Sequence, residues 1–166
     1  MDLEPKYLAL LSEAERQQLS DLDSLQLCFQ ALSLSALIDR ESAFMLAPHD
    51  LSEGRFVLLA LLEPHKEGLP PHVLADQAGV ARATITGLVD GMVRDGMVER
   101  HGNPLDRRSN LVRITRKGRQ LTRKVFAQQS RWYAGLFAVL SVNERRQLGK
   151  TLAKLSADIR ARSVQD

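Results

Sequence analysis

The amino-acid sequence predicts a mainly helical chain that carries one small two-stranded β-ribbon. In successive segments, apolar residues recur at steps of three and four, as in helices that bury one face. The stretch LVRIT (residues 111–115) instead alternates apolar and polar side chains, as a strand does, and residues 98–101 offer it a partner strand. Of the 166 residues, 44% are hydrophobic and only 5% are aromatic, so we expect a core of Leu, Val and Ala.

Two helices are expected first. Residues 12–20 predict a short helix, because Ser12 and Glu15 have the spacing of a capping box, in which each side chain satisfies an orphan amide of the other's turn. A longer helix is expected from residue 21 to about residue 45, and Pro48 ends it.

The middle of the chain predicts a buried helix followed by a turn. Asp50 and Glu53 repeat the capping-box spacing and open a helix that runs to residue 62. Its side chains are apolar nearly all round, so we expect it to be buried. Residues 68–71 then form a turn whose prolines start a further helix, and that helix ends at Gly79.

The second half predicts a helix, the ribbon and two long helices. The helix covers about residues 81–94, and Gly96 breaks it. A polar loop over residues 102–109 joins the two strands of the ribbon. A long helix follows over about residues 116–140, and a third capping-box spacing, Ser141 and Glu144, starts a last helix that ends near residue 162.

The stretch LADQAGVARATITGL (residues 74–88) has the pattern of a helix-turn-helix. Ala75 is small enough for two helices to approach closely, and Gly79 provides the turn with a conformation that glycine tolerates. Apolar side chains fall where the two helices must pack: Leu74, Ala78, Val80, Ile85 and Leu88. The exposed side of the second helix is left with short side chains and one arginine, which suits a helix in a DNA major groove: Arg82, Ala83, Thr84, Thr86 and Gly87. An ordinary helical hairpin is the alternative.

Positive charge is concentrated around this motif. Residues 80–124 contain eleven Lys and Arg and four Asp and Glu, a net charge of +7, whereas the remaining 12 basic and 16 acidic residues give −4. A cationic region in an otherwise acidic chain indicates a nucleic-acid footprint, and a solvated basic surface is the alternative. Arg94 and Arg113 belong to this region and are further candidate DNA contacts.

The ribbon that follows the second helix fits the wing of a winged helix-turn-helix. Its tip, DRRSN (residues 106–110), carries Arg107 and Arg108, which are placed to enter an adjacent minor groove, where the concentrated negative potential favours arginine. We expect Asp106 to orient Arg108 through a charge-assisted hydrogen bond. The alternative is that Asp106 caps its own turn.

The sequence thus resembles the multiple-antibiotic-resistance regulator (MarR) family of bacterial transcription factors. The resemblance is carried by LADQAGVARATITGLVDGMVRDGMVER and by the later DRRSNLVRITRKGRQL, and it is clear over residues 51–124. It implies a homodimer whose two winged helices bind successive major grooves of a pseudo-palindromic duplex DNA site. It also implies repression of transcription, with release of DNA when a small phenolic or carboxylic molecule binds between the dimer helices and the winged helix.

The resemblance implies a division of the chain into two regions. Residues 1–47 and 125–166 are expected to form the helical dimerisation region, and residues 48–124 the DNA-binding region. Apolar faces without another evident partner agree with this: Leu25, Phe29 and Leu32 in one helix, and Leu148, Leu152, Leu155 and Ile159 in another. Packing within one chain is the alternative.

Three residues are candidates for sensing. His49 and Arg55 lie where the resemblance implies a ligand pocket and are candidate anion-binding groups, with a loop histidine and a structural ion pair as the alternatives. The context of Cys28, LQLCFQAL, resembles that of family members that sense organic hydroperoxides. Those members also use tyrosines to lower the pKa of the thiol, and no tyrosine follows Cys28 up to residue 60, so a buried apolar thiol is the alternative to redox sensing.

Other classes of function lack their motifs. The sequence contains no P-loop, G-x-S-x-G, HExxH or paired-cysteine zinc motif, and His49, His65, His72 and His101 have no close ligand pairing, so we expect no enzyme, cofactor or metal site. No apolar run approaches the ~18 residues that span a bilayer. The acidic N-terminal stretch lacks the signal-peptide pattern and there is one cysteine, so a cytoplasmic protein is expected. A winged helix that binds proteins without specific DNA binding is a further alternative.

Overall fold

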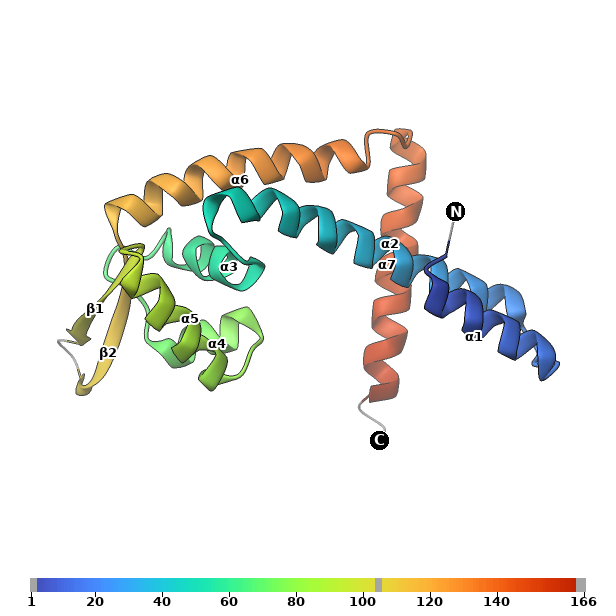
Figure 1. Ribbon diagram of the computed structural model, residues 1–166, viewed down its shortest axis with the longest axis horizontal. Helices are drawn as coiled ribbons and strands as arrows, with labels where there is room; N and C mark the ends of the chain where they lie inside the picture. The colour runs from blue at the N-terminus through green and yellow to red at the C-terminus, as the bar shows by residue number, and fades with distance from the viewer. Residues whose placement is uncertain (1–2, 104–105, 164–166) are drawn as a thin grey trace. The chain divides into compact units, whose positions relative to one another are not determined.

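The fold is that of a computed structural model, which describes residues 3–103 and 106–163 apart from the side chains of residues 103, 106–109 and 163. It is mainly helical with one two-stranded antiparallel sheet, as expected (Figure 1). Contacts divide the chain into two compact units, one up to Thr122 and one from Arg123 onward. Within the described residues, no helix is both long and apolar enough to cross a membrane. The elements in chain order are α1 (Pro5–Arg16), α2 (Leu22–Leu46), the 3-10 turn η1 (Ala47–His49), α3 (Glu53–Leu62), α4 (Pro71–Ala78), α5 (Arg82–Arg94), β1 (Val98–Asn103), β2 (Asp106–Ile114), α6 (Arg116–Leu136) and α7 (Val142–Ser163).

Helix α1 begins earlier than the sequence pattern indicated. Its first residue is Pro5, whose fixed φ is already helical and whose missing N–H would have been unsatisfied there. Ser12 therefore lies inside the helix, and the predicted start of a helix at Ser12 is wrong. Helix α1 packs on α2, where the rings of Tyr7 and Phe29 are stacked with their centroids 5.0 Å apart.

The caps of α2 and α3 use local acceptors. The Asp21 carboxylate accepts a hydrogen bond from the Ser24 N–H (3.2 Å), which begins α2 where expected. For α3 the predicted capping pair is wrong, because the Ser52 hydroxyl accepts from the Arg55 N–H (3.4 Å). Asp50 instead ends η1 in the left-handed region, at φ 54°.

The capping box at the start of α7 is confirmed. The Ser141 N–H donates to the Glu144 carboxylate (2.7 Å), and the Ser141 hydroxyl accepts from the Glu144 N–H (3.3 Å). Hydrogen bonds from the Ser141 side chain and from the Ser141 N–H to the Glu144 carboxylate favour its ionised form and hold the pKa of Glu144 below its ordinary value. Helix α6 ends at Leu136, earlier than expected, because the chain turns over residues 137–140 with a hydrogen bond from the Ala138 N–H to the Gly135 carbonyl (3.0 Å).

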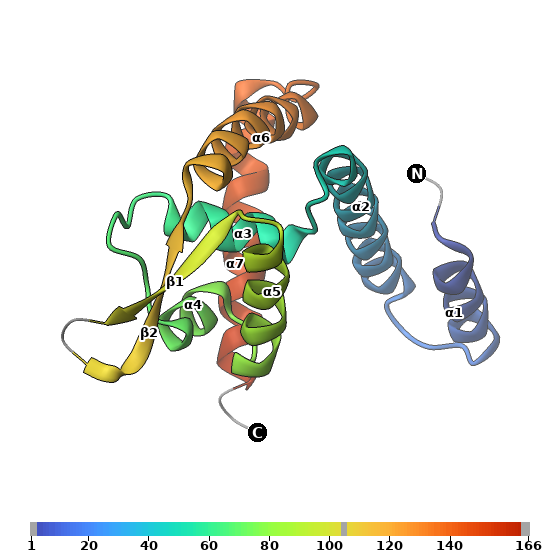
Figure 2. The ribbon, with the colours of Figure 1, turned by 60° about the vertical axis from the view of Figure 1, so that its left-hand side comes forward.

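Helix α3 forms the centre of the winged helix. It packs on α4, α5 and β2, and its Leu58, Leu59 and Leu62 are fully buried, as its apolar composition predicted. The ribbon also contacts α4 and α5, so that these elements are grouped around α3 (Figure 2). These contacts hold the inner side of α5 in place and leave its outer side exposed to solvent.

The ribbon is longer than predicted. Its register runs from Val98↔Ile114 to Gly102↔Asn110, with an irregularity before the pair Asn103↔Asp106. Most of residues 102–109 therefore belong to strands, and the predicted eight-residue loop is wrong. The base of the ribbon is anchored by two backbone hydrogen bonds between Leu69 and Val112, of 2.8 and 2.9 Å.

One glycine sets the distance between α6 and the backbone that follows α5. A Cβ at Gly118, in the first turn of α6, would lie 2.2 Å from the Met97 carbonyl oxygen and 3.0 Å from Ile114 Cγ1. Neither the backbone oxygen nor the buried Ile114 side chain can easily move, so only glycine permits this approach.

We therefore expect Gly118→Ala to lower the free energy of unfolding by about 2–3 kcal/mol, the cost of overpacking a core. Urea denaturation at a fixed protein concentration measures this. Gly135→Ala in the same helix is the control, because a Cβ there meets nothing within 4 Å, and we expect it to be neutral or stabilising. Equal effects of the two substitutions would contradict the close approach at Gly118.

Candidate nucleic-acid interface

Helix α5 has one buried and one exposed side. Ile85, Val89 and Met92 step by four and three residues and are fully buried against the rest of the winged helix. The helix begins after a turn in which Gly79 ends α4 with φ 67°, as the sequence predicted. The residues expected to face DNA are all exposed: Arg82, Ala83, Thr84, Thr86 and Gly87.

The exposed side of α5 is nearly flat at its centre. Ala83 and Gly87 are four residues apart and therefore lie above one another with almost no side chain. The hydroxyl of Thr86 donates to the Arg82 carbonyl within the helix (3.1 Å), which leaves the methyl group of Thr86 for contacts outside. A helix with this surface can approach the floor of a major groove closely.

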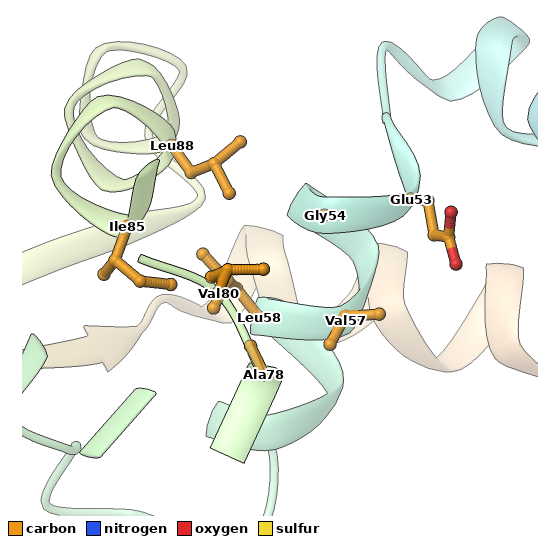
Figure 3. Close-up of a pocket in the computed structure, with 8 residues that line it drawn as sticks. All are labelled: Glu53, Gly54, Val57, Leu58, Ala78, Val80, Ile85 and Leu88. Carbon is orange, nitrogen blue, oxygen red and sulfur yellow. The ribbon is translucent and has the colours of Figure 1, made fainter. Parts of the chain in front are cut away.

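One residue of the helix-turn-helix departs from the predicted packing. Val80, expected between the two helices, is 41% exposed. Together with the part-buried Ala78 and Leu88 it borders a pocket that is open to solvent (Figure 3). Leu74 and Ile85 are fully buried, as expected.

Several basic residues of the cationic region are paired with acids of the same chain. Arg113 donates to Glu67 (2.9 Å), Arg119 donates to Glu63 (2.7 Å), and Arg100 is paired with Asp90 of α5. These pairs connect strands and helices of the winged helix. Arg113, predicted as a DNA contact, is therefore occupied by Glu67 in this arrangement.

Two basic side chains of α5 differ from these paired arginines. Arg82 and Arg94 are both exposed, and neither forms an ion pair within the part of the chain that the structure describes. They are 12 positions apart in the sequence, which places their Cα atoms about 18 Å apart along the helix axis. Arg82 thus shares the N-terminal end of α5 with the small residues, whereas Arg94 lies at the opposite end.

The predicted wing tip is only partly described. The backbone of Asp106, Arg107 and Arg108 belongs to β2. Their side chains lie outside the described part of the structure, so the pairing of Asp106 with Arg108 and the minor-groove contacts stay predictions.

The Arg55 side chain links the start of α3 to the residue that follows α5. Its Nη1 donates to the Asp50 carbonyl (2.9 Å) and its Nη2 to the Asp95 carboxylate (2.6 Å), and the side chain is only 21% exposed. Gly91 makes room for the guanidinium, because a Cβ there would lie 2.7 Å from Nη2. Arg55 therefore forms the structural ion pair that was the alternative to anion binding. His49 is half-buried in η1.

The other candidate sensing groups are separate from this site. Cys28 is exposed on α2 in the single chain, and both redox sensing and a thiol buried in the proposed dimer stay predictions. No group of three or more His, Cys, Asp or Glu among the described residues could hold a metal ion.

Comparison with known proteins identifies relatives of one kind. Residues 51–110 match the model of the MarR family. The HTH-type transcriptional repressor YetL of Bacillus subtilis (strain 168) is 36% identical over 116 residues, which are 69% of this chain and 70% of YetL.

Solved structures show the same fold. The MepR–DNA complex of S. aureus matches with a TM-score of 0.71 at 19% identity, over 79% of this chain and 96% of that chain. CouR from Rhodococcus jostii RHA1, bound to p-coumaroyl-CoA, matches with a TM-score of 0.65 at 25% identity, over 78% of this chain and 90% of that chain.

The role of Arg55 predicts an interaction between two substitutions. Gly91→Ala alone should bring no stability, because the new methyl group displaces the guanidinium from Asp95 and offsets the gain in helix propensity. In an Arg55→Ala background we expect the same substitution to stabilise the chain by about 0.5–1 kcal/mol, measured by urea denaturation. Gly87→Ala, in open space on the same helix, should have the same effect in both backgrounds. If Gly91→Ala likewise had the same effect in both backgrounds, Arg55 would not be packed on Gly91.

Proposed function

The chain belongs to the MarR family of transcriptional regulators, which are not enzymes, and from this premise we propose that it is a repressor that binds a pseudo-palindromic duplex DNA site as a homodimer. We propose further that a small phenolic or carboxylic molecule releases it from DNA. Within this proposal residues 48–124 bind DNA, and residues 1–47 and 125–166 form the dimerisation region.

The exposed side of α5 is the observation that carries the proposal. A helix that is buried through Ile85 and Val89 and flat at Ala83 and Gly87 suits insertion into a major groove. The Ala83 methyl and the Thr86 methyl are the apolar groups presented there, and such groups contact thymine methyl groups. We therefore expect thymine in the half-site opposite this part of α5.

The basic residues then divide by role. Arg82 is placed to contact bases or phosphates at the groove, and Arg107 and Arg108 to enter the minor groove from the wing. Arg94 is too far along α5 for the same groove floor and is assigned to a flanking phosphate. Arg113 contributes only if DNA displaces Glu67 from it. MepR, whose structure with DNA shares this fold, supports the general arrangement.

Exposed apolar side chains on the outer helices support a dimer. In α7 they recur at helical spacing, and each is at least half exposed: Leu152, Leu155 and Ile159. A row of this kind on a helix of a soluble domain is typical of a surface that another chain covers. Helix α2 separately exposes apolar side chains at steps of three and seven residues: Leu27, Leu34, Leu37 and Phe44.

The proposed effector follows from the relatives. CouR was solved with p-coumaroyl-CoA, which contains a phenol. Arg55 and His49 were the candidate anion-binding groups, but an anion at Arg55 would have to compete with Asp95. This competition weighs against a carboxylate at that position.

The first test is DNA binding on a site obtained by selection of bound genomic fragments. Affinity should fall steeply with salt, because phosphate contacts release counterions. We expect Arg82→Ala and Arg108→Ala each to weaken binding by about 1–3 kcal/mol, measured by fluorescence anisotropy. Arg16→Ala is the control, because Arg16 is an exposed, ion-paired arginine in α1. Salt-independent binding, or equal loss with Arg16→Ala, would refute the interface and favour a winged helix that binds proteins.

The second test is the oligomeric state. Light scattering at micromolar concentration should give twice the mass of one chain. The double substitution Leu152→Glu and Ile159→Glu should produce a monomer, because it places charges on the apolar row of α7. Lys150→Glu is the control, since residue 150 lies on the opposite side of the same helix. A wild-type monomer that still binds its DNA site would contradict the proposed architecture.

A further inference from the structure

One ion pair joins the ribbon to the exposed side of α5. The guanidinium of Arg100 in β1 is paired with the carboxylate of Asp90 in α5, and β1 and α5 are in contact. Within the proposed function, α5 enters a major groove and the tip of the ribbon enters a minor groove. The pair therefore links the two parts of the chain that must reach DNA together.

Asp90 lies on the side of α5 that is proposed to face DNA. It follows Ala83 by seven residues and Gly87 by three, so the three residues share one stripe of the helix. An acid in this position has two costs. Aspartate is a weak helix former, and a carboxylate repels the phosphates of nearby DNA. Neither helix stability nor charge attraction to DNA explains Asp90, whereas its pairing with Arg100 does.

Arg100 lies where the ribbon begins to project from the winged helix. It shares a face of the ribbon with side chains that are apolar and buried: Val98, Val112 and Ile114. The next pair on that face toward the tip, Gly102 and Asn110, is exposed. Among the described side chains of this face, Arg100 is therefore the last one toward the tip that is held by the rest of the fold.

The other described attachments of the ribbon act at its base or on elements other than α5. The backbone of Val112 is bonded to that of Leu69, and the Thr115 hydroxyl donates to carbonyls that follow α5. On the opposite face of the ribbon, Arg113 is paired with Glu67 from the segment before α4. The direction of the ribbon relative to α5 itself thus depends on the pair of Arg100 and Asp90.

A small change in the direction of the ribbon is amplified at its tip. Arg108 is four positions beyond Val112 along β2, about 13 Å for an extended strand. A tilt of about 10° at Arg100 therefore moves the backbone of Arg108 by about 2 Å. A hydrogen bond from an arginine to a base edge or a phosphate does not survive such a displacement.

The pair is suited to set a direction and not to stabilise the fold. The side chains of Arg100 and Asp90 are 42% and 47% exposed, and ion pairs at such positions add little to the free energy of unfolding. A charge-assisted hydrogen bond nevertheless fixes the orientation of the planar guanidinium. Loss of the pair should therefore affect DNA binding far more than folding.

We infer that Asp90 is a positioning residue for the wing. Its carboxylate holds Arg100 and thereby fixes the angle between the ribbon and α5, so that the contacts in the major and minor grooves are made together. The inference rests on the proposed function and adds to it a residue that acts through Arg100 without touching DNA. Because the pair is already formed in the free chain, the ribbon does not have to be ordered at the moment of binding.

The experiment compares Asp90→Ala with Glu99→Ala in the full chain, by fluorescence anisotropy on the selected DNA site. Both substitutions remove one acid from the cationic region, but Glu99 is paired with His101 of its own strand and lies on the other face of the ribbon. We expect Asp90→Ala to weaken binding at least tenfold and Glu99→Ala to leave it unchanged or slightly tighter. Asp90→Glu, which keeps the carboxylate, should stay within threefold of wild type. The urea midpoints of all three variants should be close to that of wild type.

Double substitutions test whether Asp90 acts through the wing. In an Arg108→Ala background, Asp90→Ala should cost less than threefold, because the wing contact that it positions is already lost. In an Arg82→Ala background the tenfold loss should remain, because Arg82 lies at the other end of α5, on the major-groove side.

The outcomes separate this inference from the proposed function. If the wild-type chain binds the selected DNA in a salt-sensitive way and Asp90→Ala binds it as tightly or more tightly, the positioning role is wrong and the function stands. An equal loss in the Arg108→Ala and wild-type backgrounds would overturn the role of the wing and place the effect of Asp90 on α5 itself. A lowered urea midpoint that accounts for the loss would make the pair merely structural. If the wild-type chain binds no duplex DNA, the proposed function fails and the positioning role fails with it.

Discussion

The packing of α5 on α3 is the constraint on which the rest of the winged helix depends. One helix must bury enough apolar surface to be positioned and must also present a side that fits a groove. Helical periodicity reconciles these demands, because Ile85 and Val89 are buried while Ala83 and Gly87 face outward with almost no bulk. The ribbon joins the same frame, since the Thr115 hydroxyl at the end of β2 donates to the backbone that follows α5, at 2.8 and 3.1 Å. Displacing α5 would therefore disturb the wing as well.

Ion pairs within the chain make the cationic surface smaller than the charge count of residues 80–124 indicated. Eleven basic residues of one region were treated alike in the sequence, yet the structure pairs some of them with acids. Arg113 and Arg119 are paired with Glu67 and Glu63, which lie outside the region that was counted, so the local excess of positive charge is smaller than +7. Exposed ion pairs add little stability, but they fix the direction of long side chains. The paired arginines thus connect elements of the fold, whereas Arg82 forms no ion pair within the described residues, which agrees with the DNA contact proposed for it.

Sequence features predicted the structure correctly where they act within a short segment of the backbone. Gly79 and the Ser141–Glu144 pair were identified correctly, because each acts within one turn of backbone. Helix starts with several competing signals were misplaced: Pro5 began α1 in preference to Ser12, and Ser52 caps α3 because Asp50 is taken up by the end of the 3-10 turn. The exposure of Val80 and the open pocket beside it could not be predicted, because both depend on how α3, α4 and α5 pack together. The partner of Arg55 was equally hidden, since Asp95 is forty positions away in the sequence.

The two ends of α5 are supported differently. At one end the guanidinium of Arg55 is packed on Gly91 and bonded to Asp95, an arrangement with little freedom. Nearer the other end, the part-buried Leu88 and the 41% exposed Val80 border an open apolar pocket, while Ile85 is fully buried. A ligand changes an equilibrium only by the difference between its affinities for the two states. In the proposed function, an effector that releases DNA must therefore favour a state of the chain in which α5 no longer fits the groove.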